Sequence, residues 1–445
     1  MASSSILAPK RMLSLSRPML AALCVFGLFY QPAARADYGC SVPGVITAKT
    51  WIDPANGHAA AGNGSTDDWQ NLQDMINFAI DATNIGHVEA IQFEPGSYVI
   101  SKTLMIQMLH PGDQLIGFRM SGVAAPNLTG YGPIGGVSLL LSDATHTQKA
   151  VLEIGQGALY DSSIENLALV SSTSYGTDVT PYGLLFGEQE FSHVKVDMVS
   201  VNNVGTAFAI KPGTTGGGNG ESINIDNCHA AGVNCFYEND FGQALCHSIA
   251  RCAFTINNGG TAVKIGPHGA GMGLDVTSLC GTFGAGPLRN TLIECNHIPS
   301  ALNWTGGRVE FCDTIIHYIG GGPSAIGHIT IRGMDFDACG LNALTYPGFG
   351  LVDDTLNGAN GQQFTNTIEQ CRFNGSYGSP FPALKLTTLA GDHSENFFDR
   401  DTFTGYSNKL TDLTADLSHL GAVVTHCRSA IGATGGSLFT DISYP

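Results

Sequence analysis

A six-residue pattern recurs along most of this chain and constrains its fold more than any other feature. Each copy has an aliphatic residue, two mostly polar residues, a small apolar residue, a variable residue and another apolar one. The first and fourth positions have opposite parity, so one continuous strand cannot bury both of them. A strand, a tight two-residue corner and a second strand can. The clearest copies are Ile225–Cys228, Ile249–Cys252, Leu292–Cys295, Val309–Cys312, Ile368–Cys371 and Val424–Cys427, and weaker ones start at Ile164, Val196, Ile331 and Phe398.

Short apolar segments downstream of the copies predict a third strand in each turn. These segments are 183–186, 207–210, 233–236, 262–265, 301–304, 315–318, 343–346 and 383–386. Three strands per turn, repeated along a chain, are typical of a parallel β-helix. The 57 glycines and the low charged fraction of 13% suit many tight corners around one buried core. We therefore predict an all-β, single-stranded parallel β-helix of about ten turns, stacked at ~4.8 Å per turn.

The first 36 residues have the features of an export signal. Basic residues precede the apolar run Met19–Tyr30, and Ala34-Arg35-Ala36 fits a small-residue cleavage site. The run is about 12 residues long, whereas a membrane span needs roughly 20. We predict a signal peptide over residues 1–36, a secreted or periplasmic protein, and no membrane span.

The charge of the chain argues against nucleic acid as a partner. The formal net charge is −17, and the predicted signal peptide contains basic but no acidic residues, so the mature chain is more acidic still. A nucleic-acid-binding protein presents excess positive charge to phosphates. An acidic polysaccharide stays open as a partner, because a local basic groove can bind a polyanion on an acidic protein.

The segment before the regular repeat, residues 37–120, contains motifs of a known family. Gly62–Asp68 reads GNGSTDD and precedes 69–82, where apolar residues recur at helical spacing after an acidic cap. Phe93–Tyr98 and Leu115–Gly117 follow it. These runs resemble the N-terminal region of the pectate lyase-like superfamily of right-handed parallel β-helices. The resemblance implies a right-handed coil, a capping helix over the first turn and carbohydrate-active function, because the superfamily includes lyases, hydrolases, epimerases, transferases and phage depolymerases.

The chain is predicted to form one elongated unit. The N-terminal capping segment, 37–120, runs into the β-helix domain, 121–445, without a linker. Three excursions, 211–220, 266–288 and 347–363, leave one side of the coil and are predicted to wall a groove beside it.

The cysteines are predicted to be structural. The chain has 12 of them, Cys24 lies in the signal peptide, and no CxxC pair occurs. Six occupy the fourth position of the repeat, where we expect small inward side chains stacked turn on turn. Cys235 and Cys246 lie off that position and form the pair that we would test first for a disulfide.

The solvent side of the third strand carries the candidate site. If the first and third positions of that strand face inward, the residue between them faces solvent, and three consecutive turns bring Lys264, Asn303 and His317 side by side. Flanking polar residues lie near the strand ends. The predicted catalytic residues are Lys264, His317 and Arg289, and the predicted substrate-binding residues are Asn303, Glu238, His268 and Arg308.

These residue types suit β-elimination on a polymer that contains uronic acid. Such a lyase needs a base for the proton beside the carboxylate, a cationic group for the carboxylate, and an acid for the leaving oxygen. Hydrolysis needs two carboxyl groups instead, which only loop residues such as Glu238, Asp240, Asp275 and Glu310 could supply. The third alternative is a non-catalytic glycan-binding or surface protein. No cofactor and no metal site is predicted, and calcium is an option that no acidic cluster in the sequence supports.

Overall fold

The computed structural model shows three ladders of parallel strands that wind around one core. It describes residues 44–81, 90–107, 109, 114–123, 136–143, 145–155, 158–172, 180–187, 191–211, 220–241, 244–269, 272–297, 300–319, 326–339, 352–355, 363–379, 384–387, 393–406, 411–413 and 420–430. The predicted signal peptide lies outside these residues.

The first ladder forms a sheet of its own, and every pairing in it is parallel. Its strands are β1 (Val45–Thr47), β3 (Ala90–Phe93), β6 (Gln114–Ile116), β7 (Arg119–Gly122), β10 (Ala158–Tyr160), β11 (Ser163–Glu165), β14 (Phe191–Asp197), β17 (Gly220–Asp226), β19 (Ala244–Leu245), β20 (Ser248–Ala250), β22 (Met272–Thr277), β25 (Ala301–Thr305), β28 (Ile326–Arg332), β31 (Gln363–Glu369), β34 (His393–Asp399) and β37 (Leu420–Thr425).

The second and third ladders join through two long strands, β18 (His229–Asn239) and β21 (Ala253–Ile265), which belong to both. The remaining strands of the second ladder are β2 (Asn63–Asp67), β4 (Gly96–Ile100), β8 (Val137–Leu141), β12 (Ala168–Ser171), β15 (Ser200–Asn202), β23 (Cys280–Phe283), β26 (Arg308–Glu310), β29 (Asp335–Cys339), β32 (Arg372–Ser379), β35 (Thr402–Tyr406) and β38 (Arg428–Ala430). Those of the third ladder are β5 (Leu104–Ile106), β9 (Ala150–Ile154), β13 (Tyr182–Phe186), β16 (Thr206–Ile210), β24 (Thr291–Cys295), β27 (Thr314–Tyr318), β30 (Val352–Thr355), β33 (Leu384–Thr387) and β36 (Thr411–Leu413).

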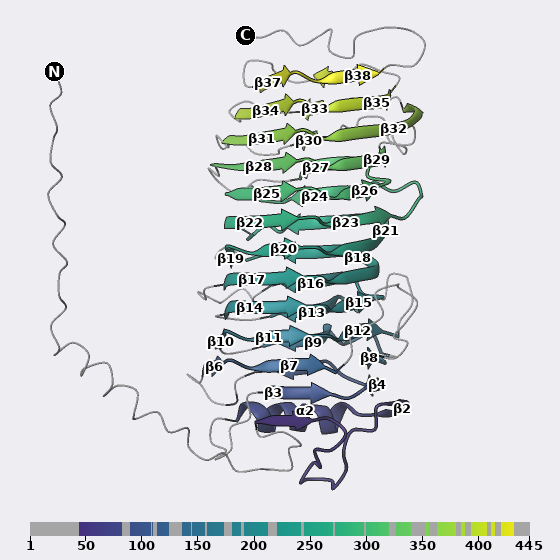
Figure 1. Cartoon of the computed structure of the whole chain (residues 1–445), viewed down its shortest axis with the longest axis vertical. Coiled ribbons are helices and arrows are strands. Elements are labelled where there is room, and N and C mark those ends of the chain that lie inside the picture. The colour runs from purple at the N-terminus through teal and green to yellow at the C-terminus, as the bar shows by residue number, and fades with distance from the viewer. Residues whose placement is uncertain are drawn as a thin grey trace, which may run out of the picture.

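The fold is therefore the predicted right-handed parallel β-helix with three strands per turn. Figure 1 shows the turns stacked along the long axis of the molecule, from the purple N-terminal strands to the yellow C-terminal ones. Strands of the N-terminal segment pair directly with later ones, as β3 does with β7 and β7 with β11, so the same ladder crosses the boundary predicted at residue 120.

A capping helix covers the first turn. Helix α2 (Trp69–Ile80) buries Leu72, Met75 and Ile76 completely and packs on β3 and β5, which confirms the helical spacing read from the sequence. The Asp67 carboxylate accepts a hydrogen bond from the Trp69 amide (3.1 Å). The neighbouring Asp68 carboxylate instead ties down the preceding loop, because it accepts from the amides of Ala61 (2.7 Å) and Gly62.

The two-residue corner predicted from the repeat is present after the first-ladder strands. The third residue of the pattern adopts the left-handed conformation, with φ of 51° at Asn227, 52° at Arg251 and 58° at Gln370. This single residue reverses the parity, so the fourth position, for example Cys228 or Cys252, turns inward and is buried. The weaker copies behave alike, since Asn166, Met198, Gly333 and Arg400 also have positive φ.

Two of the six clear copies lie elsewhere in the turn. Leu292–Cys295 falls inside β24 of the third ladder, and Val309–Cys312 spans the corner between β26 and β27. The predicted third strand at 301–304 is β25 of the first ladder. The cause is a missed turn: residues 266–288, predicted to be a glycine-rich loop, contain β22 and β23. The excursion predicted over 347–363 likewise contains β30.

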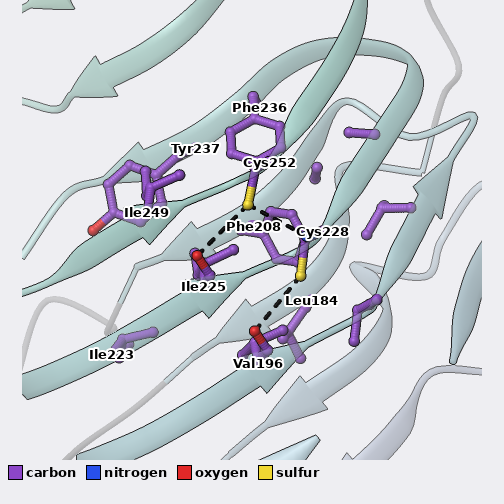
Figure 2. Packing of buried hydrophobic residues seen from close by; sticks show 14 of the residues in the cluster. Leu184, Val196, Phe208, Ile223, Ile225, Cys228, Phe236, Tyr237, Ile249 and Cys252 are labelled. Carbon is purple, nitrogen blue, oxygen red and sulfur yellow. Dashed lines mark hydrogen bonds between the residues drawn. The ribbon is translucent and has the colours of Figure 1, made fainter. Parts of the chain in front are cut away.

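Stacks of identical side chains run through parts of the core. Phe336 lies parallel to Phe373 at 4.9 Å, and Phe373 lies 4.7 Å from Phe403. In Figure 2 the sulfur atoms of Cys228 and Cys252 lie one turn apart, and each thiol donates to a carbonyl of the turn below, Val196 or Ile225, over 3.6 Å. The repeat thus stacks these small side chains inward as predicted.

The pair suggested for the first disulfide test, Cys235 and Cys246, is not bonded in the structure. Cys235 is buried beside the third ladder, whereas Cys246 is exposed at a corner of the first ladder, and both are free thiols. All ten cysteines in the described part of the chain are free.

Among the described residues, no helix has the length and apolar character that crossing a membrane requires.

Candidate functional site

One register position of the third ladder forms an outward-facing row of charged residues. Pairing in register places Glu238 beside Lys264, Lys264 beside Glu294, and Glu294 beside His317. The residues that follow them, such as Ile265, Cys295 and Tyr318, face inward and are fully buried. We call Glu238, Lys264, Glu294 and His317 the charged row. By backbone register, Asp353, Lys385 and Asp412 continue it.

The prediction that Lys264 and His317 share a solvent-facing row is correct, but their neighbour is not Asn303. Glu294 lies between them, on the strand that the sequence pattern assigned to a corner. Asn303 lies in β25 of the first ladder, beside Asp275, whose carboxylate accepts a hydrogen bond from its amide over 2.9 Å. Because residues 266–288 were predicted to be a loop, the prediction assigned Asn303 to the third ladder, whereas it lies on the first.

Opposite charges alternate along the row and its flank. Lys211, at the end of β16, contacts the Glu238 carboxylate at 3.0 Å, and Lys264 lies 3.4 Å from Glu294. Burial disfavours the charged form of each lysine, but the nearby carboxylates, Glu238 for Lys211 and Glu294 for Lys264, outweigh it and raise both lysine pKa values. Both ammonium groups are therefore charged at neutral pH.

Glu238 is the most enclosed member of the row. Its side chain is only 9% exposed, compared with 18% for Glu294 and 33% for Lys264. Besides Lys211, its carboxylate accepts a hydrogen bond from the Thr206 hydroxyl over 3.4 Å. A carboxylate at this depth keeps a fixed orientation.

Arg289 joins the row from the loop before β24. Its Nη1 donates to His317 Nε2 over 3.0 Å, and its Nε donates to the Thr314 hydroxyl over 3.0 Å. Because guanidinium has no acceptor, Nε2 of His317 must carry a lone pair in this arrangement. The structure thus brings together Arg289, His317 and, through Glu294, Lys264, which are the three predicted catalytic residues.

The other predicted binding residues are divided between the row and a separate face. His268 lies at the edge of the row, where its Nδ1 is 3.2 Å from Asp240, and its side chain is 73% exposed. Arg308 belongs to β26 of the second ladder and pairs with Asp337 (2.5 Å) and Glu310 (2.9 Å). Arg308 is therefore part of a surface ion-pair network away from the charged row.

The carboxyl groups considered for hydrolysis lie on different ladders. Asp275 is on the first ladder and Glu310 on the second, whereas Glu238 lies on the charged row and Asp240 follows it. Glu294, which the sequence reasoning missed, is the second carboxylate of the row. Two strand spacings separate Glu238 from Glu294, which is ~9–10 Å between backbones.

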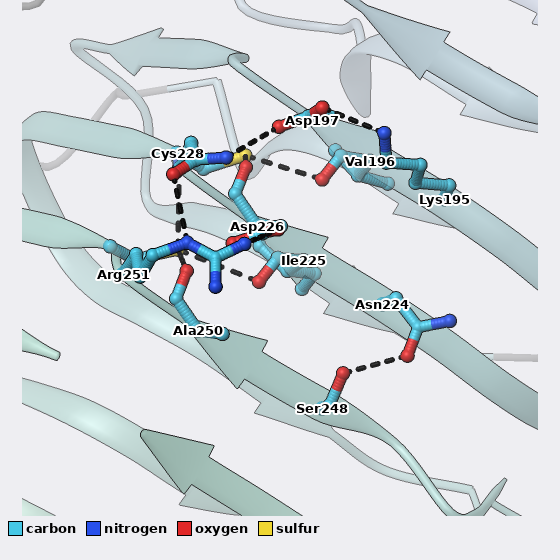
Figure 3. Close-up of polar contacts among 12 residues, drawn as sticks. Lys195, Val196, Asp197, Asn224, Ile225, Asp226, Cys228, Ser248, Ala250 and Arg251 are labelled. Atoms are coloured by element: carbon cyan, nitrogen blue, oxygen red, sulfur yellow. Dashed lines mark hydrogen bonds and ion pairs between the residues drawn. The ribbon is translucent and has the colours of Figure 1, made fainter. Parts of the chain in front are cut away.

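The first ladder carries a second charged cluster at its corners (Figure 3). Lys195 pairs with Asp197 at 2.8 Å, Asn227 donates to Asp197 over 3.0 Å, and Arg251 pairs with Asp226. Lys195 and Asp197 lie in the same strand, whereas Asn227 and Arg251 each contact a carboxylate of the neighbouring turn, so this cluster links turns together. Within the described residues, no group of three or more His, Cys, Asp or Glu side chains is arranged to hold a metal ion.

The arrangement on the charged row can bind and polarise an anionic or hydroxyl-rich ligand. It offers two ammonium groups, a guanidinium group, a neutral imidazole and two carboxylates on one outward face. A polymer that lies along the rod would meet them in sequence, because they are spaced by single turns.

Comparisons with known proteins support the fold. No protein-family model matches the chain, and no curated protein sequence matches it. Among solved structures, a mutant of DFA-IIIase from Arthrobacter chlorophenolicus A6 in complex with DFA-III matches with a TM-score of 0.53 at 12% identity, covering 84% of this chain and 86% of that one. The same enzyme without its lid matches with a TM-score of 0.50 at 13% identity, over 86% and 98% of the two chains. PfbA, a surface adhesin of Streptococcus pneumoniae, matches with a TM-score of 0.47 at 12% identity, over 85% and 95%. At these identities the likeness to the two DFA-IIIase structures shows a shared fold alone, and the chain is a right-handed parallel β-helix protein.

Proposed function

We propose that this protein is an exported carbohydrate-active enzyme that cleaves a polymer containing uronic acid by β-elimination at the charged row. The contact between Arg289 and His317 carries the proposal, because it sets a cation and a neutral base 3.0 Å apart on an outward face. The N-terminal motifs that resemble the pectate lyase-like superfamily support carbohydrate-active function in general.

Arg289 and His317 have separate roles in the proposed reaction: Arg289 binds the substrate carboxylate and His317 accepts a proton. A uronate carboxylate is a better partner for Arg289 than a neutral imidazole is, because charged hydrogen bonds are about twice as strong. When the substrate carboxylate binds the Arg289 guanidinium in place of His317, the lone pair on His317 Nε2 becomes available to accept a proton. His317 then accepts the proton from the carbon beside the carboxylate, a carbon–carbon double bond forms, and the bond to the leaving glycosidic oxygen breaks.

Lys264 supplies charge rather than a proton-accepting group in this scheme. The carboxylates of Glu294 and Glu238 raise its pKa, so it remains an ammonium ion. Negative charge that develops on the uronate during proton removal is stabilised by such a fixed cation. The leaving oxygen takes its proton from water.

Hydrolysis is the second candidate, and one observation favours it. Glu238 and Glu294 flank Lys264 on the same row, two strand spacings apart. Their backbones are therefore ~9–10 Å apart, a spacing comparable with the ~6.5–9.5 Å found between the two carboxyl groups of inverting glycosidases. In that mechanism the enclosed Glu238 and the more exposed Glu294 would act as acid and base.

One assay separates the candidates. Mature protein is incubated with a panel of uronate-containing and neutral polysaccharides, and products are scored for ultraviolet absorbance of unsaturated uronides and for reducing ends. Elimination predicts absorbance that His317→Gln abolishes and Glu238→Gln only weakens. Hydrolysis predicts reducing ends without absorbance, which both Glu238→Gln and Glu294→Gln abolish.

Asn303→Ala is the matched control, since Asn303 lies on the first ladder and should leave turnover unchanged. Reducing ends without unsaturated products would overturn the elimination mechanism. The absence of both signals across the panel would overturn the enzymatic proposal and leave a glycan-binding role.

A further inference from the structure

A cavity of about 460 Å³ opens on the outer face of the third ladder, toward the N-terminal end of the rod. Its lining is polar and includes Gln107, Gln148, Lys149 and Glu153. Cavities of this size accommodate small ligands. Neither the charged row nor the proposed reaction uses it.

The cavity lies on the same register row as the candidate site. Glu153 pairs with Leu185, Leu185 with Ala209, and Ala209 with Glu238. Three strand spacings, ~14 Å, therefore separate Glu153 from Glu238 along the rod. A polymer aligned with the long axis could contact both.

The stretch between the two is apolar. Leu185 and Ala209 form a small buried cluster outside the main core, and the half-buried ring of Tyr182 packs against it. The Lys211 ammonium, which also contacts Glu238, lies 5.8 Å from the centre of that ring. The partly exposed Tyr182 ring, between polar groups, is suited to the C–H face of a sugar ring.

The walls of the cavity are held in place. The Gln148 side-chain carbonyl accepts a hydrogen bond from the Thr103 backbone amide over 3.0 Å, and the Gln148 backbone amide donates to the Asp143 carboxylate over 2.7 Å. Two glycines leave room for the lining: a Cβ on Gly187 would lie 2.5 Å from Glu153 Oε1, and one on Gly155 would lie 3.3 Å from Gln107. A site that is fixed before binding loses less entropy when it binds.

We propose that this cavity is a distal subsite that binds a hydroxyl-rich sugar residue of the same polymer chain that occupies the charged row. The Glu153 carboxylate accepts sugar hydroxyls, the Gln107 amide both donates and accepts, and Lys149 donates. The inference rests on the proposed function, since it takes the substrate to be a glycan chain lying along the rod.

The test is a length series of ligands. Dissociation constants are measured by calorimetry for oligogalacturonates from dimer to octamer, and for cello-oligosaccharides of the same lengths as the neutral probe, on the full mature chain in the inactive His317→Gln background. We expect affinity to rise steeply once the chain is long enough to span from Glu238 to Glu153. We expect Lys149→Ala and Glu153→Gln each to weaken the long oligosaccharides about tenfold and to leave the short ones unchanged.

Lys149 is exposed at the surface, so its variant should fold even if Glu153→Gln does not. Equal losses for long and short ligands, no loss for either, or no binding of either probe would overturn the subsite. Failure of the proposed function gives a different result. If the wild-type protein shows the length-dependent gain in affinity but no turnover, the subsite is supported and the enzymatic proposal is overturned.

Discussion

Asp401 should make the protein less stable as the pH rises through neutrality. It occupies the apolar fourth position of a repeat copy, next to Cys371 and Cys427 in the corner stack, and is fully buried. Burial raises its pKa from the model-peptide value of 3.8 to about 8. Its Oδ2 atom is buried without a hydrogen-bond partner among the described residues. The folded state therefore holds this carboxyl group protonated at neutral pH.

The sign and size of the effect follow from linkage. A group whose pKa is raised on folding binds a proton in the folded state that the unfolded state has released, so stability falls as pH rises from about 4 to about 8. Between pH 3.8 and 7 the loss approaches three pKa units, or about 4 kcal/mol at 1.36 kcal/mol per unit. Above the folded pKa the loss from this group levels off.

Asp401→Asn should remove that loss. The amide keeps the acceptor for the Cys371 amide, which lies 2.7 Å from the Asp401 carboxylate, but brings a donor with no evident partner, at a cost of ~1–3 kcal/mol. We therefore expect the variant to be more stable than wild type at pH 7 by about 1–3 kcal/mol and less stable at pH 4.

Urea unfolding at a series of pH values measures this difference directly. Asp399→Asn is the control: the hydrogen bond from His426 holds the pKa of the partly exposed Asp399 carboxyl at about 2, so its removal should leave most of the loss toward high pH in place, because burial is the main cause of the raised Asp401 pKa. The same pH profile in Asp401→Asn as in wild type, or a variant that is less stable at pH 7, would refute the account of Asp401 as a buried neutral acid.

Three further outcomes are expected. Phe373→Ala should lose ~3–5 kcal/mol of unfolding free energy in urea titrations, because the fully buried ring stacks on both neighbouring turns; a loss below 1 kcal/mol would contradict that packing. Tyr237→Phe should lose ~1–3 kcal/mol in the same titrations, because its hydroxyl makes a 2.8 Å hydrogen bond with His247 Nδ1 in the core, and an unchanged midpoint would contradict this. Alkylation of the native protein, followed by mass spectrometry, should modify the exposed Cys246 and leave Cys228 intact, since burial raises the pKa of the Cys228 thiol; rapid labelling of Cys228 would contradict its place in the core.

The corners could be predicted from the sequence because the direction in which a side chain points, inward or outward, depends only on neighbouring residues. Two apolar positions three residues apart require one residue that reverses direction, and Asn227, Arg251 and Gln370 have the positive φ that does so. The capping helix was equally local, since its apolar spacing needs no knowledge of distant residues. Both were predicted from the chain alone.

The candidate site was only partly predictable because it depends on counting turns. The sequence of Leu292–Cys295 fits the corner pattern, but it also fits a third-ladder strand in which the charged residue Glu294 faces outward. Cys228 and Cys252 are 24 residues apart, whereas the next copy starts much farther along the chain, and this gap was the available signal for an unrecognised turn. Missing it hid Glu294 and placed Asn303 on the row. Contacts that depend on three-dimensional proximity, such as that of Arg289 with His317, had no signal in the spacing.

The regularity of the third ladder has a consequence for how a long ligand can move. A chain that slides along the rod by one turn meets the next strand of the same ladder but the opposite charge, since Glu238, Lys264 and Glu294 alternate in sign at ~4.8 Å intervals. A charged group on the ligand regains a favourable neighbour only after two turns. Movement along this face is therefore expected in two-turn steps, with the intermediate position disfavoured by like-charge repulsion, and the order of side chains rather than the shape of the coil sets the register of a bound polymer.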